Sequence, residues 1–383
     1  MIFLSSIDIV QVENVNQYLD VIASNNLYEY VSRGQAKQYP TLDSSAFRLD
    51  EPRMFKSMVK AYFETIGNEL TPMQEKHFLA FSQHHGIPTN LIDFTNRHLV
   101  SLFFACYDTE KCAGQSGYIK FIKSDRLINC NNLIINFEYG EGLLNKILGV
   151  NEVTKSFSYI AAEIHKKNPS YIVEHFFELV DLLKEIDQKK VFYAFYELVE
   201  QHKNNILSNY TFKDYPIYGE LLAAIYKSCE HEDANFFISD EKRLTSIKDY
   251  MKHRNYFSID LSDINLYLLL LNIVFLEYLS LFGRDNNPEK IELPFYLTYI
   301  PPNIDNRIAS QSSIFIYQLF YEGGHVYGKE YSDIFWQQKI NTDFEIEVTD
   351  KKGTLAQLDK LGVNLMTIYN DYDNIAKYIK SSI

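Results

Sequence analysis

Cysteine is scarce in this sequence of 383 residues, with copies only at positions 106, 112, 130 and 229. These are too few and too scattered for a disulfide scaffold, and no Cys-x-x-Cys pair indicates a zinc site. The first residues, MIFLSSIDIVQVEN, lack a basic stretch and become acidic at Asp8, so no signal peptide is evident. We therefore expect a reduced, cytoplasmic setting.

Glycine and proline are also sparse, at 15 and 10 residues, while aromatic residues reach 15%. Few helix breakers and many large side chains favour long helices that pack through aromatic surfaces. The alternative explanation is a genome that favours Tyr, Phe, Ile, Asn and Lys. A hydrophobic content of 46% excludes wholesale disorder, and the length predicts two or three domains.

Positive charge is in deficit, because 37 Lys and Arg face 50 Asp and Glu, a net charge of −13. This argues against a protein that coats DNA constitutively, since such binding comes mainly from basic side chains, but it leaves room for a local basic groove. Basic residues do gather on a predicted helix over 240–256, where Lys248 and Lys252 share one face. That face would steer RNA or DNA, or is simply a solvated helix face.

One hydrophobic run, 264–282, is long enough to span a bilayer, but it contains Asn265, Asn272 and Glu277. A carboxylate near the hydrocarbon core is costly, so a buried helix of a soluble bundle is the better interpretation and no membrane association is expected.

Hydrophobic periodicity and turn residues divide the chain into an N-terminal helical segment (1–26), a first core part (27–123), a mostly helical insertion (124–292) and a second core part (293–383). Helices outside the insertion are predicted over 14–25, 53–69, 72–85, 98–107, 351–361 and 372–381. Strands are predicted over 27–32, 87–95, 117–122, 295–300, 313–318 and 344–348. Thr71 and Gln74 have the spacing of a capping box, and Gly34 predicts a turn after the first strand.

Polar residues of chemical interest concentrate in three segments, 30–48, 81–105 and 299–318. Arg33 precedes a glycine, and a guanidinium there would hold a phosphate or carboxylate. Taken singly, each residue has a structural alternative: Arg33 as a surface arginine in a turn, His84 as a helix C-terminal residue, and Asp93 as a helix cap. The polar residues at predicted element ends in the second segment are Gln83, His84, Thr89, Asp93 and Thr95.

Together these segments resemble the FRG domain family. The resemblance rests on RGQ at 33–35 with SSAFR at 44–48, on QHHGIPTNLIDFT at 83–95, on RIASQSSIF at 307–315, and on the end of the chain over 358–380. It covers roughly 27–123 and 293–383. The sequence departs from the family where Ser32 replaces the phenylalanine of the family name and Ser312-Ser313 replaces the usual glycine.

The resemblance implies a bacterial or phage-defence setting and, more remotely, the ADP-ribosyltransferase fold, whose order of motifs is similar. The implied fold is α+β, with a mixed-sheet core formed by both ends of the chain and a large helical insertion. Arg33 would then hold the NAD diphosphate, Asp93 and Thr95 would order the nicotinamide ribose, and Gln311 would take the position of the late acidic residue. The expected catalytic residues are Gln311, Asp93 and His84; the expected NAD-binding residues are Arg33, Gln35, Gln83, Thr89, Thr95 and Arg307; no metal is expected.

No glutamate stands near Gln311, where the transferase pattern has one. The nearest Glu-x-Glu is Glu345 and Glu347 on the strand 344–348, which we interpret as an edge strand with a solvated face.

Three functions are therefore open. The first is an NAD-dependent ADP-ribosyltransferase-like toxin or effector of a phage-defence system, modifying RNA, another nucleic acid or a protein, and controlled by an antitoxin or another defence protein. The second is a non-catalytic module that binds a nucleotide or a protein partner. The third is an NAD glycohydrolase, which differs only in releasing free ADP-ribose.

Overall fold

The computed structural model describes residues 9–107, 112, 114–131, 161–162, 164–187, 190–210, 217–229, 266–268, 270–271, 273–274, 290–293, 295–302, 310–322, 325–326, 329–330 and 335–382. The basic segment 240–256 and Arg307 lie outside these residues. Where the run 264–282 is described, it is helical, and Leu266, Tyr267 and Leu270 are buried. Among the helices that the structure describes, none is both long and apolar enough to cross a bilayer.

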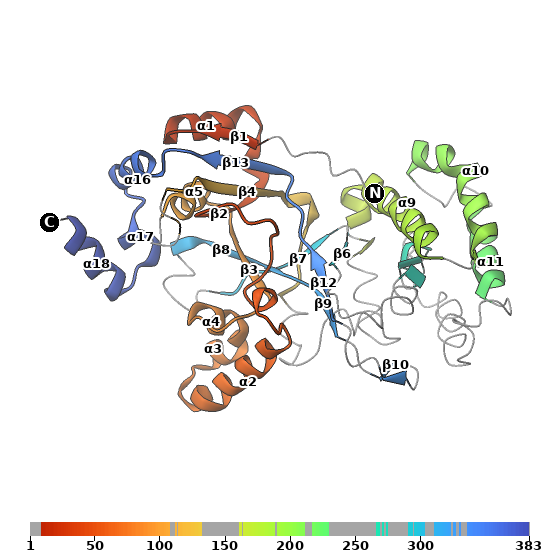
Figure 1. The fold of residues 1–383 in the computed structure, drawn as a ribbon, viewed down its shortest axis with the longest axis horizontal. Coiled ribbons are helices and arrows are strands. Elements are labelled where there is room, and N and C mark those ends of the chain that lie inside the picture. Colours follow the sequence, from red (N-terminus) through yellow and green to blue (C-terminus); the bar gives the residue numbers. More distant parts are fainter. Residues whose placement is uncertain are drawn as a thin grey trace. The chain divides into compact units, whose positions relative to one another are not determined.

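The chain forms two compact units (Figure 1). The first combines residues 1–140, 296–318 and 339–383, and the second combines 141–295 and 319–338. Both ends of the sequence thus build the first unit, while 319–338 belongs to the second. The division at 26, 123 and 292 stays a prediction.

The first unit is built around a mixed eight-stranded sheet in the order β1-β13-β4-β2-β3-β8-β7-β5. The outermost pairs, β1–β13 and β5–β7, are parallel, and the inner pairs are antiparallel. With the surrounding helices this makes the fold α+β, as predicted. The strands are β1 (Ile9–Val12), β2 (Tyr30–Gln35), β3 (Leu91–Thr95), β4 (Gly117–Lys123), β5 (Leu127–Asn129), β7 (Tyr296–Tyr299), β8 (Ser313–Tyr317) and β13 (Phe344–Val348).

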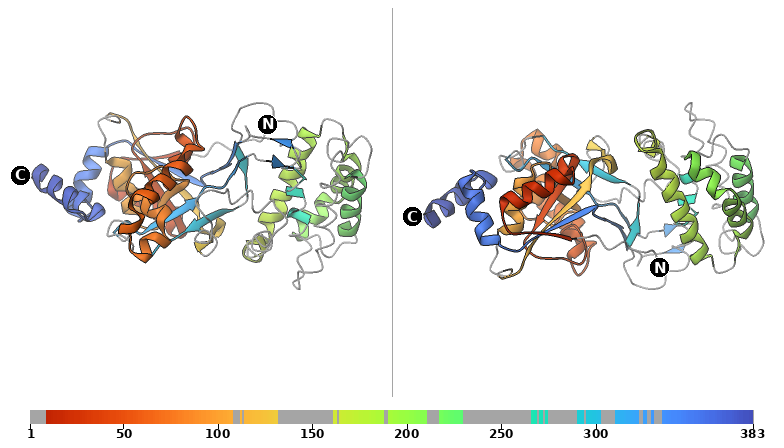
Figure 2. Two further views of the ribbon diagram at one scale, coloured as in Figure 1. Left: turned by 90° about the horizontal axis from the view of Figure 1, so that it is seen from below. Right: turned by 90° about the horizontal axis from the view of Figure 1, so that it is seen from above.

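Helices pack on this sheet in two groups. In Figure 2, α2, α3 and α4 lie in front of the sheet seen from below, and α1 lies in front of it seen from above. The main core cluster joins α1, α5 and α16 to the sheet through Tyr18, Phe103, Phe121, Ile346 and Leu358. The helices are α1 (Val15–Ser24), α2 (Met54–Ile66), α3 (Pro72–Lys76), α4 (Phe78–His84), α5 (His98–Cys106), α16 (Lys351–Lys360), α17 (Leu365–Tyr369) and α18 (Tyr372–Ser382).

Gly34 does not form the predicted turn, because β2 continues through it to Gln35. A Cβ built on Gly34 would lie 1.9 Å from the carbonyl oxygen of Ser101 in α5. One on Gly117 of β4 would lie 2.1 Å from the carbonyl oxygen of Ala105. The two glycines let α5 approach the sheet backbone, so Gly34 is needed for helix packing and not for a reversal of the chain.

Gly34→Ala is expected to lower the free energy of unfolding by about 1–3 kcal/mol, because the added methyl group meets backbone atoms that cannot rotate away. Urea denaturation of the purified variants measures this. Gly219→Ala in the second unit is the control, because a Cβ there meets nothing within 4 Å. Equal stability of the Gly34 variant and the wild type would contradict the packing role.

Two boundaries differ from the sequence prediction. The helix predicted over 72–85 is divided into α3 and α4 at His77, whose buried Nδ1 bonds the hydroxyl of Tyr299 in β7. The strand predicted from residue 87 begins at Leu91. The predicted capping box of Thr71 and Gln74 is confirmed, with both reciprocal hydrogen bonds present.

The second unit is largely helical where it is described. Its long helices are α9 (Pro169–Ile186), α10 (Tyr193–Asn209) and α11 (Ile217–Cys229). After α9, the carboxylate of Asp187 accepts hydrogen bonds from the backbone of Val191 and Phe192 and from the hydroxyl of Tyr196. Short strands also belong to this part of the chain: β6 (Lys290–Glu292), β9 (Phe320–Glu322), β10 (His325–Val326), β11 (Lys329–Glu330) and β12 (Phe335–Lys339).

The prediction that 344–348 is an edge strand with a solvated face is wrong. β13 lies between β1 and β4. Glu345 is 8% exposed, and its Oε1 lies 2.7 Å from Nζ of Lys120 on β4 and accepts a hydrogen bond from Thr342. β1 pairs with the edge of β13 that faces away from β4, so β13 is an interior strand, and its Glu345 forms a buried ion pair with Lys120.

Candidate active site

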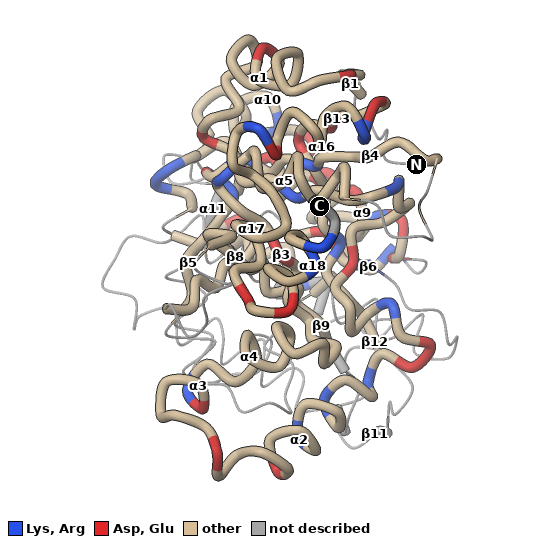
Figure 3. The backbone as a smooth tube through the Cα atoms, turned by 90° about the vertical axis from the view of Figure 1, so that its left-hand side faces the viewer, with Lys and Arg blue, Asp and Glu red and all other residues tan. Residues whose placement is uncertain are grey.

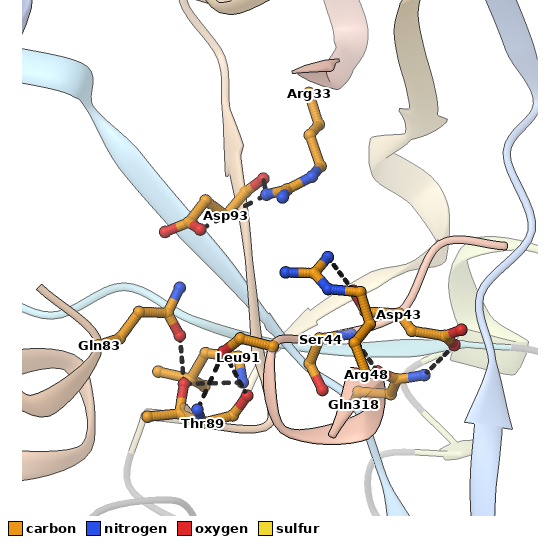
Figure 4. Close-up of polar contacts among 10 residues, drawn as sticks. Arg33, Asp43, Ser44, Arg48, Gln83, Thr89, Leu91, Asp93 and Gln318 are labelled. Atoms are coloured by element: carbon orange, nitrogen blue, oxygen red, sulfur yellow. Dashed lines mark hydrogen bonds and ion pairs between the residues drawn. The ribbon is translucent and has the colours of Figure 1, made fainter. Parts of the chain in front are cut away.

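The centre of the sheet opens between β2 and β3, which pair only at Ser32 and Thr95 within the described strands. Beyond that pair the Arg33 side chain spans the gap. Its Nη1 donates to the carbonyl oxygen of Asp93 at 2.8 Å and lies 3.4 Å from the Asp93 carboxylate (Figure 4). The Nε of Arg33 is buried without a hydrogen-bond partner among the described groups. The guanidinium therefore keeps donor capacity for a ligand.

A pocket of about 270 Å³ lies at this opening. Its walls come from β2, β3 and β8 of the sheet and from α4 and α5, so residues far apart in sequence meet there. Six residues predicted as site residues line it: Arg33, Gln83, His84, Asp93, Thr95 and Gln311. The structure thus brings together residues from all three polar segments.

The third segment is attached to the second by Thr95. Its Oγ1 donates to the carbonyl oxygen of Gln311 at 2.7 Å and accepts from the backbone N–H of Arg97. The Gln311 amide donates to the carbonyl oxygen of Ile368 at 3.3 Å. Ser312, with φ 46°, has the left-handed conformation that favours glycine. Thr95 therefore acts on the position of Gln311, and Gln311 is anchored from the C-terminal helices.

The other three predicted site residues are Thr89, Gln35 and Arg307, and the structure places none of them in the pocket lining that it describes. Thr89 is fully buried and bonds the Gln83 side chain, so it positions that residue and does not line the pocket. Gln35 is buried on β2, and its Oε1 has no partner among the described groups, but it too is absent from the pocket lining. The placement of Arg307 is outside the described residues.

The pocket floor contains a buried hydroxyl cluster that the sequence does not predict. Ser32 Oγ is 2.8 Å from Ser101 Oγ and 2.8 Å from Nδ1 of His98, and both serines line the pocket. Burial lowers the pKa of His98 below its ordinary value. A neutral imidazole thus supports two hydroxyls at the pocket floor. The one signal in the sequence is a serine inside the apolar helix 98–107.

This cluster makes stability depend on pH. Because the pKa of His98 is lower in the folded than in the unfolded chain, its contribution is complete above the unfolded value of roughly 6.5 and is lost as the pH falls through the folded value. We expect the melting temperature to fall between pH 7.5 and pH 5.5, and to fall less in His98→Gln. His77, whose pKa burial also lowers, accounts for a remaining slope. An undiminished slope in His98→Gln would contradict this assignment.

The pocket lining contains one guanidinium group, that of Arg33, and one carboxylate. Asp93 is the acidic residue in the lining, and its side chain is 53% exposed. Glu345 and Glu347 are not in the lining. Along the described parts of the chain, acidic and basic residues are interspersed without a long stretch of one sign (Figure 3). The polar chemistry available is one guanidinium, one carboxylate, two amides, one imidazole and several hydroxyls.

Comparison with protein families relates part of this site to a known domain. The family model of the FRG domain matches residues 28–113. The chain contains an FRG domain. No curated protein and no solved structure matches the chain. The matched FRG stretch carries Arg33, the α4 residues of the pocket, β3 and α5, whereas Gln311 comes from outside it.

Proposed function

We propose that the protein is an NAD-dependent ADP-ribosyltransferase-like enzyme whose site is the pocket between β2 and β3. The observation that supports this is the convergence of Arg33, Asp93 with Thr95, and Gln311 on one pocket. This is the set that the resemblance to the transferase order of motifs assigns to the diphosphate, the nicotinamide ribose and the late strand. Arg33 offers a largely enclosed guanidinium, 19% exposed, with an unpartnered Nε.

The proposed reaction breaks the bond between C1′ of the ribose and the nicotinamide nitrogen, and the bonding electron pair leaves with nicotinamide. Positive charge develops on the ribose, and an oriented carboxylate or amide oxygen stabilises it. Asp93 and Gln311 supply these oxygens. A nucleophilic atom of the acceptor forms the new bond to C1′, and its proton passes to His84 or to solvent. Water as the acceptor gives free ADP-ribose, the glycohydrolase outcome.

The test is incubation of the purified protein with NAD labelled in the adenylate part, with and without a bacterial cell extract. We expect release of nicotinamide and label in the RNA or protein fraction. Nicotinamide release with all label in free ADP-ribose identifies a glycohydrolase. Neither nicotinamide release nor label transfer would contradict both enzymatic proposals.

A non-catalytic FRG module that binds a nucleotide or protein partner is the second candidate. One observation favours it: the pocket lining contains no glutamate, and its one acid is half exposed. A binding module would retain NAD or ADP-ribose without consuming it, which calorimetry followed by chromatography of the ligand distinguishes from turnover.

The role as a toxin or effector of a phage-defence system, paired with an antitoxin or other defence protein, rests on the family resemblance. Its test is growth of bacteria that express the chain from an inducible promoter. Normal growth at full expression would contradict toxicity of the free protein.

A further inference from the structure

A second pocket, of about 170 Å³, adjoins the first and flanks the same Arg33, Gln83 and Asp93 side chains. Its other wall is the turn that carries Arg48. Ligand pockets for molecules of drug size are usually ~300–1,000 Å³, so either pocket alone holds only part of such a ligand. One ligand that extends past Arg33 would occupy both.

Arg48 faces this second pocket at the end of the short 3₁₀ turn Ala46–Arg48. Its Nη1 donates to the carbonyl oxygen of Asp43 at 3.0 Å, and no ion pair joins it to a carboxylate of the described chain. Burial lowers the pKa of Arg48, and the positive charge of Arg33 lowers it further, against smaller opposing effects of Tyr39 and the two nearby aspartates. Two guanidinium groups that repel one another at a shared cavity form a site that an anion stabilises.

The turn that carries Arg48 is held rigidly. The buried Gln318 accepts from the backbone N–H of Ser44 and donates to the Asp43 carboxylate. The backbone N–H of Ala46 and the hydroxyl of Ser45 both donate to the carbonyl oxygen of Thr89, two residues before β3 begins at Leu91. Arg48 is thus preorganised next to β3 (Figure 4).

The carboxylates of Asp43 and Asp93 also line the second pocket, and they differ in how far other hydrogen bonds already occupy them. Asp43 is occupied by Thr41 and Gln318. The Asp93 side chain is half exposed and its carboxylate lies 3.4 Å from Nη1 of Arg33, so this carboxylate is able to turn toward a hydroxyl group. Guanidinium groups bind phosphate through charge-assisted hydrogen bonds. A carboxylate and the Gln83 amide beside them supply hydrogen-bond partners for the hydroxyl groups of an attached sugar.

We infer that the second pocket is a phosphate subsite, in which Arg48 and Arg33 together bind the phosphate groups of a phosphorylated ribose that extends into the first pocket. Arg48 is then a ligand-binding residue. This deepens the proposed function, on which it rests for the choice of ADP-ribose as the probe. The phosphate subsite is equally required if the FRG domain binds a nucleotide without chemistry.

The experiment is calorimetric binding of ADP-ribose and of adenosine to the full chain. We expect ADP-ribose to bind the wild type at least about tenfold more tightly than adenosine, as for a charge-assisted hydrogen bond. Arg48→Gln is expected to remove most of that preference. Lys60→Gln, the same charge change at a side chain paired with Glu64 on α2, is expected to retain it.

Melting curves show whether each variant is folded. If Arg48→Gln does not fold, Arg48→Lys keeps the charge and a donor for the Asp43 carbonyl while losing the planar fork, and is expected to weaken ADP-ribose binding severalfold with adenosine binding unchanged. A folded Arg48→Gln with the wild-type preference would overturn the inference, as would a wild type that binds both ligands equally. These outcomes are separate from turnover: a protein that loses ADP-ribose through Arg48→Gln but never cleaves NAD has the subsite without the proposed reaction.

Discussion

Replacement of Arg33 with alanine is expected to reduce nicotinamide release from NAD on the order of 10²–10³-fold, the usual cost of removing one preorganised group from a site of developing charge. The reason is geometric. Arg33 is the side chain that spans the opening between β2 and β3, and it borders both pockets. Without it, the diphosphate of the proposed substrate would keep only Arg48 as a guanidinium partner.

Two controls separate this effect from a folding defect. Lys60→Ala removes one positive charge from an exposed position on α2 and is expected to retain full activity. Arg33→Lys keeps the charge without the fork and is expected to recover part of the activity. If the NAD-cleaving activity of Arg33→Ala equals that of the wild type, the assignment of the site to this pocket is contradicted.

Glu345→Ala is expected to destabilise the first unit by about 3–5 kcal/mol, because it leaves the ammonium group of Lys120 buried without its carboxylate. Lys120 is 7% exposed and Glu345 is 8% exposed, on neighbouring interior strands. On the other side of β4, Lys120 pairs with Arg33 of β2. Loss of this ion pair therefore weakens the strand that carries Arg33.

Glu347→Ala is the matched control, since it removes the same side chain from the same face of β13. Glu347 is bonded to Gln11 and to the Tyr118 hydroxyl and lies nearer solvent. We expect it to cost about 1 kcal/mol. Urea denaturation compares the two variants. The combined Lys120→Met and Glu345→Leu change is expected to recover most of the lost stability, and equal effects of the two single glutamate variants would contradict the buried-pair account.

Much of the fold follows from local sequence signals. Alternation in 117–122, 313–318 and 344–348 predicts strands that the structure contains, and the apolar stretch 98–107 predicts α5. The capping box at Thr71 was readable because both of its partners lie within four residues. Such elements are specified by near neighbours, which is why sequence alone identifies them.

The errors share one cause, which is packing between distant segments. Gly34 has the local chemistry of a turn, but the close approach of α5 decides its role. The helix predicted over 72–85 is divided at His77, whose side chain is hydrogen-bonded to Tyr299, far along the chain. β1 covers β13 although its four residues carry little signal. None of these contacts leaves a periodic pattern in the sequence.

The site could be predicted only in part. Its members lie on segments separated by 60 residues at Arg33 and Asp93 and by 216 residues at Thr95 and Gln311, so no spacing rule joins them. In the sequence, only the resemblance to the FRG domain family groups these residues into one site. The sequence marks Ser32 only as a departure from the family and does not predict its contact with Ser101, because the two serines meet only in the fold. The sequence marks Arg48 only as part of the SSAFR motif, because the second guanidinium, that of Arg33, comes near it only in the fold.

The most direct test of the account is a crystal structure of the protein with a non-hydrolysable NAD analogue. We expect the nicotinamide ribose to lie between residues 93–95 and Gln311, with the diphosphate against Arg33. An analogue bound elsewhere in the chain, or absent from the pocket at saturating concentration, would contradict the assignment of this pocket as the NAD site.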